Sequence, residues 1–284
     1  MTTTWAITTM EGLGNRLHLV RDDALGFSGR HAAAVCAATP ADGVIVFGVS
    51  DASPPRCMIW NADGSSAELC GNGLRCLVRL GVESGWLDPT GDRLQSAACL
   101  HQVRMESDGR VTVSMPEPMH GREHVGLIEH SDFEVAGDVL TYLDGSRGWR
   151  VHPVSTGNPH AVLFVDRAEH ATMLPVLGPA IGMHAAVPAG INVHLVDVCD
   201  GGLELVTWER GVGPTPACAT GATAAVAAAH AADLIEGGAT VSMAGGRLEV
   251  KIESDLAWNT GAADHVGTWT TPLESTDADP PLRA

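Results

Sequence analysis

The feature of this sequence that most constrains its fold is a pattern that occurs twice. In each copy a short apolar segment leads through a turn to a cysteine, and a helical stretch follows. Cys70 lies nine residues after Asn61, Cys218 lies nine residues after Glu209, and each cysteine stands three residues before a glycine at the expected helix start. Two copies of one pattern predict two similar lobes, with the functional site in the cleft between them.

The remaining elements predict an α+β fold. Short apolar runs bounded by Gly, Pro and Asp indicate strands at 17–20, 44–49, 161–165, 192–198 and 203–207. Helices are expected at 29–39, from 73 to about 86, at 169–181 with an interruption at Pro175, and from 221 to about 235 with a stop at Gly237–Gly238. Strands therefore outnumber helices and alternate with them irregularly.

Paired prolines mark the expected boundary between the lobes, because Pro116-Glu117-Pro118 interrupts regular structure. We expect an N-terminal lobe over 1–117, joined by a returning strand at about 263–273, and a C-terminal lobe over 118–262. The polar tail at 274–284 is predicted to be disordered.

The charge of the chain excludes several classes of partner. A formal net charge of −17 argues against nucleic acid and against an anionic membrane surface, since both require clustered Lys and Arg. The sequence contains no apolar run of about 20 residues and opens without the basic and apolar regions of a signal peptide. We therefore expect a cytoplasmic protein that binds a small molecule and keeps its seven cysteines as thiols.

The two cysteine motifs have the chemistry for proton transfer. A helix start offers unpaired N–H groups and a partial positive charge, which bind a carboxylate and lower the pKa of a nearby thiol. A thiolate on one side of a carbon and a thiol on the other form a base and an acid, as inversion of a stereocentre requires. Stabilisation of the enolate-like carboxylate by fixed dipoles would then be the main catalytic contribution.

Cofactor and metal chemistry find little support in the sequence. There is no Walker loop and no GxGxxG after a strand, and the single lysine, Lys251, lies in a strand-like segment unsuited to a pyridoxal-phosphate Schiff base. Cys70 and Cys76 do not form a CxxC pair, so we expect neither a zinc site nor a thioredoxin-like redox site. We predict no cofactor and no metal.

Single cysteines are more often core residues than catalytic ones, and this interpretation applies to Cys36, Cys57, Cys76, Cys99 and Cys199. Arg75, on the helix expected from 73 to about 86, is expected to pair with an acidic neighbour rather than to contact substrate. Cys70 and Cys218 are exceptions, because the repeated pattern around them indicates a catalytic role rather than a place in the core.

The motifs resemble a known family, the diaminopimelate epimerases. Residues 61–65 (NADGS) followed by 70–75 (CGNGLR) are similar to its signature. The resemblance continues in order at 12–15 (GLGN), 157–162 (GNPHAV), 190–193 (GINV) and 208–211 (WERG), so that it spans about residues 10 to 270.

This resemblance implies a cofactor-independent epimerase that interconverts LL- and meso-diaminopimelate in lysine and peptidoglycan synthesis. Its two pseudo-symmetric lobes would each be a mixed or antiparallel sheet wrapped on a central helix. Cys70 and Cys218 would be the acid–base pair, flanked by Glu209 and His160. The implied substrate-binding residues are Asn15, Asn61, Gly71, Asn72, Asn158, Asn192, Glu209, Arg210, Ala219 and Thr220.

Within this set the backbone at 71–72 and 219–220 would hold the reacting carboxylate, and Arg210 would form a bidentate pair with the distal one. The second motif departs from the family at Pro214, Pro216 and Ala219, where Gly-Glu-Thr-Xaa-Ala-Cys-Gly-Thr-Gly is usual. A racemase of another amino acid such as histidine, or a non-catalytic amino-acid-binding module, is therefore an alternative, and a homodimer is left open.

Overall fold

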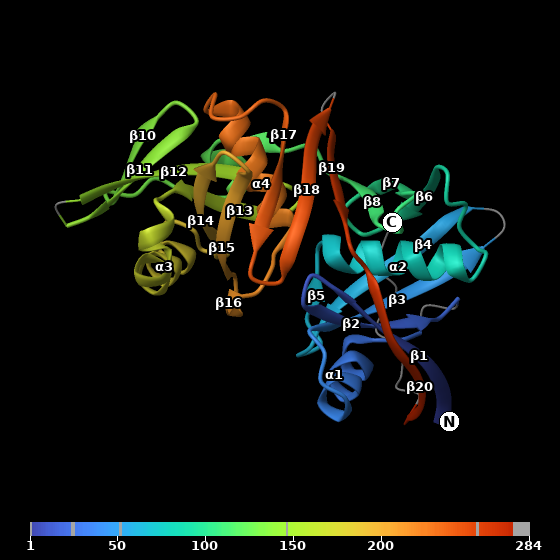
Figure 1. The fold of residues 1–284 in the computed structure, drawn as a ribbon. Helices are drawn as coiled ribbons and strands as arrows, with labels where there is room; N and C mark the ends of the chain where they lie inside the picture. Colours follow the sequence, from blue (N-terminus) through green and yellow to red (C-terminus); the bar gives the residue numbers. More distant parts are fainter. Residues whose placement is uncertain (1, 24–25, 51–52, 146, 254–255, 275–284) are drawn as a thin grey trace. The chain divides into compact units, whose positions relative to one another are not determined.

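The computed structural model describes residues 2–23, 26–50, 53–145, 147–253 and 256–274 (Figure 1). The chain forms two units, one made of Met1–Val113 and Gly261–Ala284 and the other of Ser114–Thr260. Most of the tail that the sequence predicts to be disordered, 275–284, lies outside the described residues, while Glu274 is the last residue of a strand.

The first unit is built from two helices and a mixed sheet. Its elements are β1 (Thr2–Gly12), β2 (Asn15–Arg21), α1 (Gly29–Ala38), β3 (Gly43–Ser50), β4 (Ser53–Asn61), β5 (Ser66–Ala67), α2 (Gly71–Glu83), β6 (Asp92–Gln95), β7 (Leu100–Met105), β8 (Val111–Met115), which runs past the unit boundary, and β20 (Asp264–Glu274).

The second unit has the same kinds of element. They are β9 (Met119–His120), a 3-10 turn (Arg122–Val125), β10 (Phe133–Ala136), β11 (Val139–Asp144), β12 (Arg147–Ser155), β13 (Pro159–Phe164), α3 (Arg167–Gly182), β14 (Asn192–Cys199), β15 (Gly202–Glu209), β16 (Gly213–Thr215), α4 (Ala219–Ala231), β17 (Gly238–Met243), β18 (Gly246–Glu253) and β19 (Leu256–Gly261). The predicted α+β class is confirmed.

The order of strand pairings is the same in the two units. In the first, β1–β2, β3–β4, β4–β5, β6–β7 and β7–β8 are antiparallel, whereas β2–β3 and β4–β6 are parallel. Strands β12 to β19 repeat this series one for one, with parallel pairs at β13–β14 and β15–β17. The repeat that two cysteine motifs predict therefore extends over whole units.

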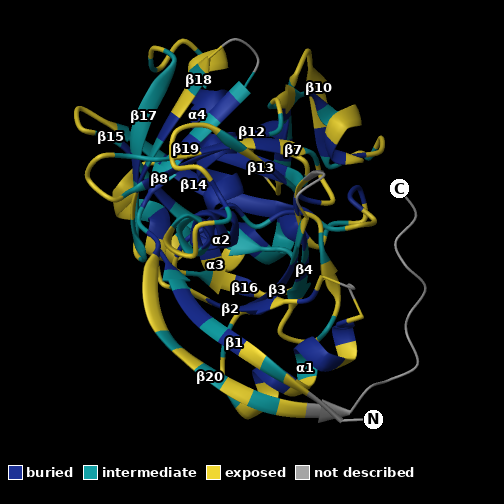
Figure 2. Cartoon of the chain, turned by 90° about the vertical axis from the view of Figure 1, so that its right-hand side faces the viewer, coloured by how far each residue is buried: buried dark blue, intermediate teal, exposed yellow. Residues whose placement is uncertain are grey.

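Each unit also has a further neighbour for its first strand: β20 pairs with β1, and β9 pairs with β12. Figure 2 shows β20 running beside β1, with exposed and half-buried residues alternating along it. This alternation is typical of a strand with one face toward solvent.

Strands β13 and β14 are covered on both faces, which explains their continuous apolar sequences. On one face their odd-numbered residues pack against α3 in a core that includes Leu163, Leu195, Leu177 and Ile181. On the other face lies α4, whose Ala-rich sequence lets it contact strands of the sheet closely (Figure 1). The even-numbered side chains of β13 and β14 therefore lie on the α4 side.

The two motif helices begin earlier than the sequence suggests. We expected starts at Gly73 and Gly221, but α2 begins at Gly71 and α4 at Ala219. The reason is that each preceding cysteine is itself the N-cap residue, a position at which Ser, Thr, Asn or Asp is the usual signal.

The expected interruption of α3 does not occur, because the helix continues through both Pro175 and Pro179. Each proline removes one backbone donor. Burial of Leu174, Leu177 and Ile181 against the sheet offsets that loss.

Helix α4 ends before the expected stop at Gly237–Gly238. Asp233 adopts a left-handed conformation with φ 56°. Its N–H donates to the carbonyl of His230 at 3.0 Å, and the N–H of Leu234 donates to the carbonyl of Ala229 at 2.9 Å. This is a Schellman arrangement, which sequence reasoning missed because Gly rather than Asp usually signals it.

Close approach of β15 and β17 makes a specific demand on Gly202. A Cβ at Gly202 would lie 2.2 Å from the carbonyl oxygen of Thr240, and the residue has φ 126°, whereas a Cβ at Gly201 would meet nothing within 4 Å. We expect Gly202→Ala to lower the free energy of unfolding by about 2–4 kcal/mol. Gly201→Ala should stay within about 0.5 kcal/mol of wild type.

Urea unfolding of the two variants measures this difference. Equal midpoints for Gly202→Ala and Gly201→Ala would contradict the packing described for this turn.

Candidate active site

Cys70 and Cys218 occupy the same structural position, the N-cap of a helix. Both have extended backbone conformations, with φ −139° and −132°. The sulfur of Cys70 accepts the N–H of Gly73 at 3.4 Å, and the sulfur of Cys218 accepts the N–H of Gly221 at 3.3 Å. Each thiol is therefore fixed at the positive end of a helix, where negative charge on sulfur is stabilised.

The glycine of each motif is required by packing as well as by the cap. A Cβ at Gly73 would lie 2.4 Å from Cδ1 of Ile45, and a Cβ at Gly221 would lie 2.3 Å from Cε1 of His194. Each helix start is thus pressed against a side chain of the sheet beneath it. A larger residue at either position would have to displace that side chain or the helix start itself.

Around Cys70, two of the predicted polar residues take different positions. Asn15, at the start of β2, lies beside the thiol, with Cys70 Sγ donating to its Oδ1 at 3.8 Å. Asn61, at the end of β4, is exposed, and its Nδ2 donates to Oγ of Ser65 at 2.9 Å. Asn72 lies in the first turn of α2, and Gly12 of β1 packs on its backbone.

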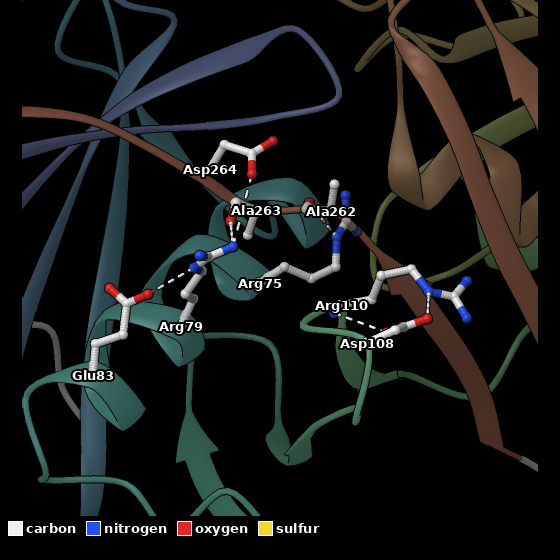
Figure 3. Close-up of polar contacts among 8 residues, drawn as sticks. All are labelled: Arg75, Arg79, Glu83, Asp108, Arg110, Ala262, Ala263 and Asp264. Carbon is white, nitrogen blue, oxygen red and sulfur yellow. Dashed lines mark hydrogen bonds and ion pairs between the residues drawn. The ribbon is translucent and has the colours of Figure 1, made fainter.

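Arg75 of α2 is fully buried and supports this first turn; Figure 3 shows its side chain directed at Ala262. Its guanidinium donates to the carbonyl of Gly71 at 3.3 Å, to Oδ1 of Asn72 at 2.6 Å and to the carbonyl of Ala262 at 3.4 Å. The expectation of an acidic partner is wrong, because the partners of Arg75 among the described residues are carbonyl oxygens and an amide. Arg75 is therefore a positioning residue for the first turn of α2.

The charge of Arg75 also acts on Cys70. Burial lowers the pKa of Arg75 to about 10, and electrostatic interactions, first with Cys76 and then with Cys70, counteract part of this change. A guanidinium with that pKa is still protonated at neutral pH. It therefore favours negative charge on the neighbouring sulfur.

Around Cys218 the electrostatics are different. Burial, followed by the charge of Glu209, raises the pKa of Cys218 well above its usual value, while hydrogen bonds from Thr220 and Gly221 act in the lowering direction. The expectation that the helix start makes this thiolate accessible near neutral pH is therefore corrected, because desolvation outweighs the helix. Glu209 in turn accepts a hydrogen bond from the hydroxyl of Thr215.

His160 is connected to the second cysteine motif by hydrogen bonds through two other side chains. Its Nε2 contacts Oδ1 of Asn158 at 2.8 Å, and Nδ2 of Asn158 donates to Oγ1 of Thr220 at 3.4 Å. Thr220 Oγ1 lies 3.4 Å from the sulfur of Cys218. Within the described residues His160 thus reaches a thiol indirectly, rather than flanking it as predicted.

His194 is a buried residue of this group that the sequence analysis did not identify. Its Nε2 lies 2.8 Å from Nδ1 of His160, and its ring packs under Gly221. Burial lowers the pKa of His194 to about 3 and that of His160 well below its usual value. A histidine two residues after Gly-Ile-Asn, on the same face as His160, was the available signal.

The remaining predicted residues of the second motif are held in place by the backbone. Asn192 donates to the carbonyl of Pro159 at 2.9 Å and accepts the N–H of Arg210 at 2.9 Å. The Arg210 side chain donates to the carbonyl of Ala189 at 3.4 Å and lines a cavity of about 630 Å³ with Trp208.

Ala219 has its carbonyl held by two donors, Nδ2 of the buried Asn259 at 3.2 Å and Oγ1 of Thr223 at 3.0 Å. The carbonyl of Gly71, at the equivalent position, accepts from Arg75, which like Thr223 lies four residues further along the helix. Both helix starts are therefore stabilised at the same point by different side chains.

All seven cysteines are free thiols. Cys36, Cys57 and Cys76 are buried as expected, and burial raises the pKa of Cys57 and of Cys76 to about 12. The interpretation as core residues is wrong for Cys199, which is exposed, and holds only in part for the half-buried Cys99.

One group of described residues has the composition of a metal site: His130, Asp132 and His184. Backbone N–H groups occupy the Nδ1 lone pairs, that of Asp132 donating to His130 at 3.2 Å and that of Ala186 to His184 at 3.0 Å. The proton of His184 is then on Nε2, which donates to Oδ2 of Asp132 at 3.2 Å. Both ring nitrogens of His184, Nδ1 of His130 and Oδ2 of Asp132 are therefore already engaged in hydrogen bonds.

None of the helices in the described ranges is long and apolar enough to span a bilayer.

Sequence comparison finds relatives over most of the chain. Residues 153–266 match the family model for diaminopimelate epimerase. The diaminopimelate epimerase of a Cyanothece species is 37% identical over 257 residues, which cover 86% of this chain and 90% of the relative. That of Methanothermobacter thermautotrophicus is 36% identical over 225 residues, 76% of each chain.

Solved structures share the fold at lower identity. A hydroxyproline epimerase from Agrobacterium vitis has a TM-score of 0.64 and 15% identity, over 96% of this chain and 92% of that chain. A predicted epimerase from Pseudomonas aeruginosa has a TM-score of 0.66 and 17% identity, over 94% of this chain and 98% of that chain.

The buried histidines make stability depend on pH. A histidine whose pKa is lowered on folding binds its proton only in the unfolded chain between the folded pKa and about 6.5, so stability falls as pH drops below about 6.5 and is unaffected above it. His194, with a pKa of about 3, should by itself cost about 2 kcal/mol between pH 7 and pH 5. Urea unfolding at a series of pH values measures the loss, and an unchanged slope in His194→Gln would refute this assignment.

Arg75 should be more important to the first motif than its neighbour Arg79, which is 30% exposed and contacts Glu83 and the carbonyl of Ala263 (Figure 3). Arg75→Met removes three hydrogen bonds, two of them to the buried Gly71 and Asn72, so we expect a loss of about 2–4 kcal/mol in the free energy of unfolding. Alkylation of Cys70 by iodoacetamide should also slow at neutral pH, because the adjacent cation is gone.

Arg79→Met is the matched control, with an expected loss below about 1 kcal/mol and Cys70 alkylation as in wild type. Equal behaviour of the two variants would show that the buried guanidinium has no special role.

Proposed function

The chain belongs to the diaminopimelate epimerase family, and from this premise we propose that it inverts the α-carbon of LL-diaminopimelate to give the meso form, without a cofactor. The observation that carries the proposal is the pair of cysteine N-caps, one in each repeat, with the same sulfur–glycine hydrogen bond. Relatives that cover most of the chain have this activity in their names.

In the proposed reaction the two thiols act on opposite faces of one carbon. The C–H bond of the α-carbon breaks, and its proton forms an S–H bond with one cysteine as thiolate. The S–H bond of the other cysteine breaks, and its proton forms the new C–H bond on the opposite face. No electrons are gained or lost overall, so the reaction needs no oxidant or reductant.

The charges around the two cysteines favour one starting state. A buried cation, Arg75, lies near Cys70, whereas the carboxylate of Glu209 and complete burial disfavour a thiolate at Cys218. We infer that Cys70 is the thiol that ionises to act as the base, and that Cys218 keeps its proton and acts as the acid. Cys70 then removes the first proton, and Cys218 supplies the second.

The reacting carboxylate gains negative charge as the proton leaves. Unpaired N–H groups at the starts of α2 and α4, including those of Asn72 and Thr220, are suited to stabilise it. One such fixed donor is worth about 3 kcal/mol to a reaction of this kind. Arg210 is the cation that suits the distal carboxylate of a dicarboxylic substrate.

The altered loop before Cys218 favours a runner-up, a racemase acting on another amino acid such as histidine. Pro214 pairs with Trp208 across β15 and β16, and the carbonyl of Pro216 accepts the N–H of Gly245 at 2.8 Å. The prolines are thus accommodated without disturbing the cap at Cys218, which supports the same proton-transfer chemistry. Their effect is on the surroundings of the substrate.

We place the enzyme in the cytoplasm, because its two essential thiols would be lost to oxidation in an oxidising compartment.

Exchange of the α-proton in deuterated water tests both reaction and substrate. We expect wild type to incorporate deuterium into LL- and meso-diaminopimelate, and Cys70→Ser and Cys218→Ser each to lose at least about a hundredfold in rate. Cys199→Ser, at an exposed thiol, is the control with wild-type rates. Mass spectrometry and chiral chromatography measure the products.

Exchange with histidine alone would transfer the assignment to the runner-up. Wild-type turnover by either active-site variant would exclude the two-thiol mechanism.

A further inference from the structure

Two imidazoles lie side by side beneath the first turn of α4. His160 of β13 and His194 of β14 are both fully buried, and their rings are tilted at 36° with centroids 5.0 Å apart. Their strands pair in parallel with Asn192 opposite His160, so both histidines project from the same face of the sheet. A pair of buried histidines is costly unless hydrogen bonds satisfy it.

The hydrogen bonds of the pair form a continuous series that ends at sulfur. His194 Nε2 contacts His160 Nδ1 at 2.8 Å, and His160 Nε2 contacts Asn158 Oδ1 at 2.8 Å. Asn158 Nδ2 then contacts Thr220 Oγ1, and Thr220 Oγ1 contacts Cys218 Sγ, each at 3.4 Å. Five side chains from two strands, a loop and a helix are thereby linked.

The direction of donation in this series follows from its far end. Nδ1 of His194 is buried and has no hydrogen-bond partner among the described residues. If His160 donated to His194, the Nε2 of His194 would be the acceptor and its proton would lie on Nδ1, as a buried N–H without a partner. If His194 donates to His160 instead, its proton lies on Nε2, and Nδ1 carries only a lone pair, which costs less to leave buried without a partner.

The environment of Asn158 agrees with this direction. Its Oδ1 also lies within reach of the Thr156 hydroxyl, which donates at 3.2 Å. An oxygen at this position therefore accepts from both Thr156 and His160, and the amide nitrogen is left to donate to Thr220. Thr220 accepts from Asn158 and has its own proton available for sulfur.

We propose that His194 is a positioning residue for the acid–base chemistry of Cys218: as the first donor of a one-way series through His160, Asn158 and Thr220, it directs the Thr220 hydroxyl onto the sulfur. This inference rests on the proposed function of Cys218 as an acid–base thiol. Hydrogen bonds aligned in one direction polarise one another, so the series supports the thiolate that forms when Cys218 gives up its proton.

The series acts against two other influences on the same thiol. Burial and the carboxylate of Glu209 oppose the thiolate, whereas the N–H of Gly221 favours it. Burial, followed by the electrostatic effects of His194 and of Arg210, lowers the pKa of His160 well below its usual value and keeps it neutral. Neutrality is necessary for the series, because a protonated His160 could not accept from His194.

Gly221 connects the series to the cap geometrically. The missing side chain at Gly221 makes room for the His194 ring, while its N–H holds the Cys218 sulfur at 3.3 Å. The position of the ring and the position of the thiol are therefore set by the same residue.

The tautomers provide a test that needs no substrate and whose measurement is made on wild-type protein, with a variant used only to assign the signals. Nitrogen-15 NMR of histidine-labelled wild-type protein at pH 7 should show two neutral imidazoles with the proton on Nε2 that belong to His160 and His194. The set of signals that disappears in His194→Gln belongs to His194, and the set that remains belongs to His160. An Nδ1–H tautomer at either residue reverses the direction of the series and overturns the proposal.

Alkylation of Cys218 tests the effect on sulfur. The rate of iodoacetamide labelling against pH is followed by peptide mass spectrometry, with the exposed Cys199 as reference in the same sample. In His194→Phe, which keeps a ring but no donor, we expect the midpoint for Cys218 to rise by about half a pH unit, a threefold lower rate at pH 7. His194→Gln places an amide N–H near the same point and should restore the wild-type midpoint.

A merely structural role would affect melting temperature in both variants and leave the midpoint unmoved, and that result would overturn the proposal. If His194→Phe does not fold, the NMR measurement on wild type still decides the direction. Since neither readout requires turnover, failure here is distinguishable from failure of the proposed epimerase activity.

Discussion

The structure of both half-sites depends on one interaction, the acceptance of a backbone N–H by a cysteine sulfur at the start of a helix. The cap fixes the thiol within 3.4 Å of the N–H of Gly73 and within 3.3 Å of that of Gly221. It also requires glycine at those positions, because the sheet beneath leaves no space for a Cβ. A weak acceptor is used where Ser or Asp would cap better, which is understandable if the sulfur is needed for chemistry.

The two caps are alike in geometry and different in electrostatics. The first helix start is supported by a buried cation, Arg75, and the second by neutral groups, Thr223 and Asn259. The second thiol is more deeply buried and lies near Glu209. An exact repeat would give two thiols of equal acidity, whereas a base and an acid need unequal ones. The differences between the halves therefore contribute to function as much as the repeat does.

The repeat itself is carried by strand pairing rather than by residue identity. Parallel pairs fall at the same two places in each unit, and a helix follows the second and the fifth strand of each series. The side chains around these elements differ from one unit to the other. Gly73, for example, packs against Ile45, whereas the equivalent Gly221 packs against His194. Backbone hydrogen bonds preserve the frame, and each core is packed in its own way.

The sequence by itself determined the α+β class, several of the central strands, the doubled cysteine motif and the family, because apolar periodicity and short motifs are local features. It did not determine the helix starts at Gly71 and Ala219, since cysteine is an unusual cap, nor the end of α4, where Asp233 takes a conformation that usually signals glycine. The burial of Arg75 and the pairing of His160 with His194 were decided only by the tertiary structure. Those contacts join residues far apart in the chain, and their energies come from desolvation and hydrogen-bond geometry that a local pattern does not contain.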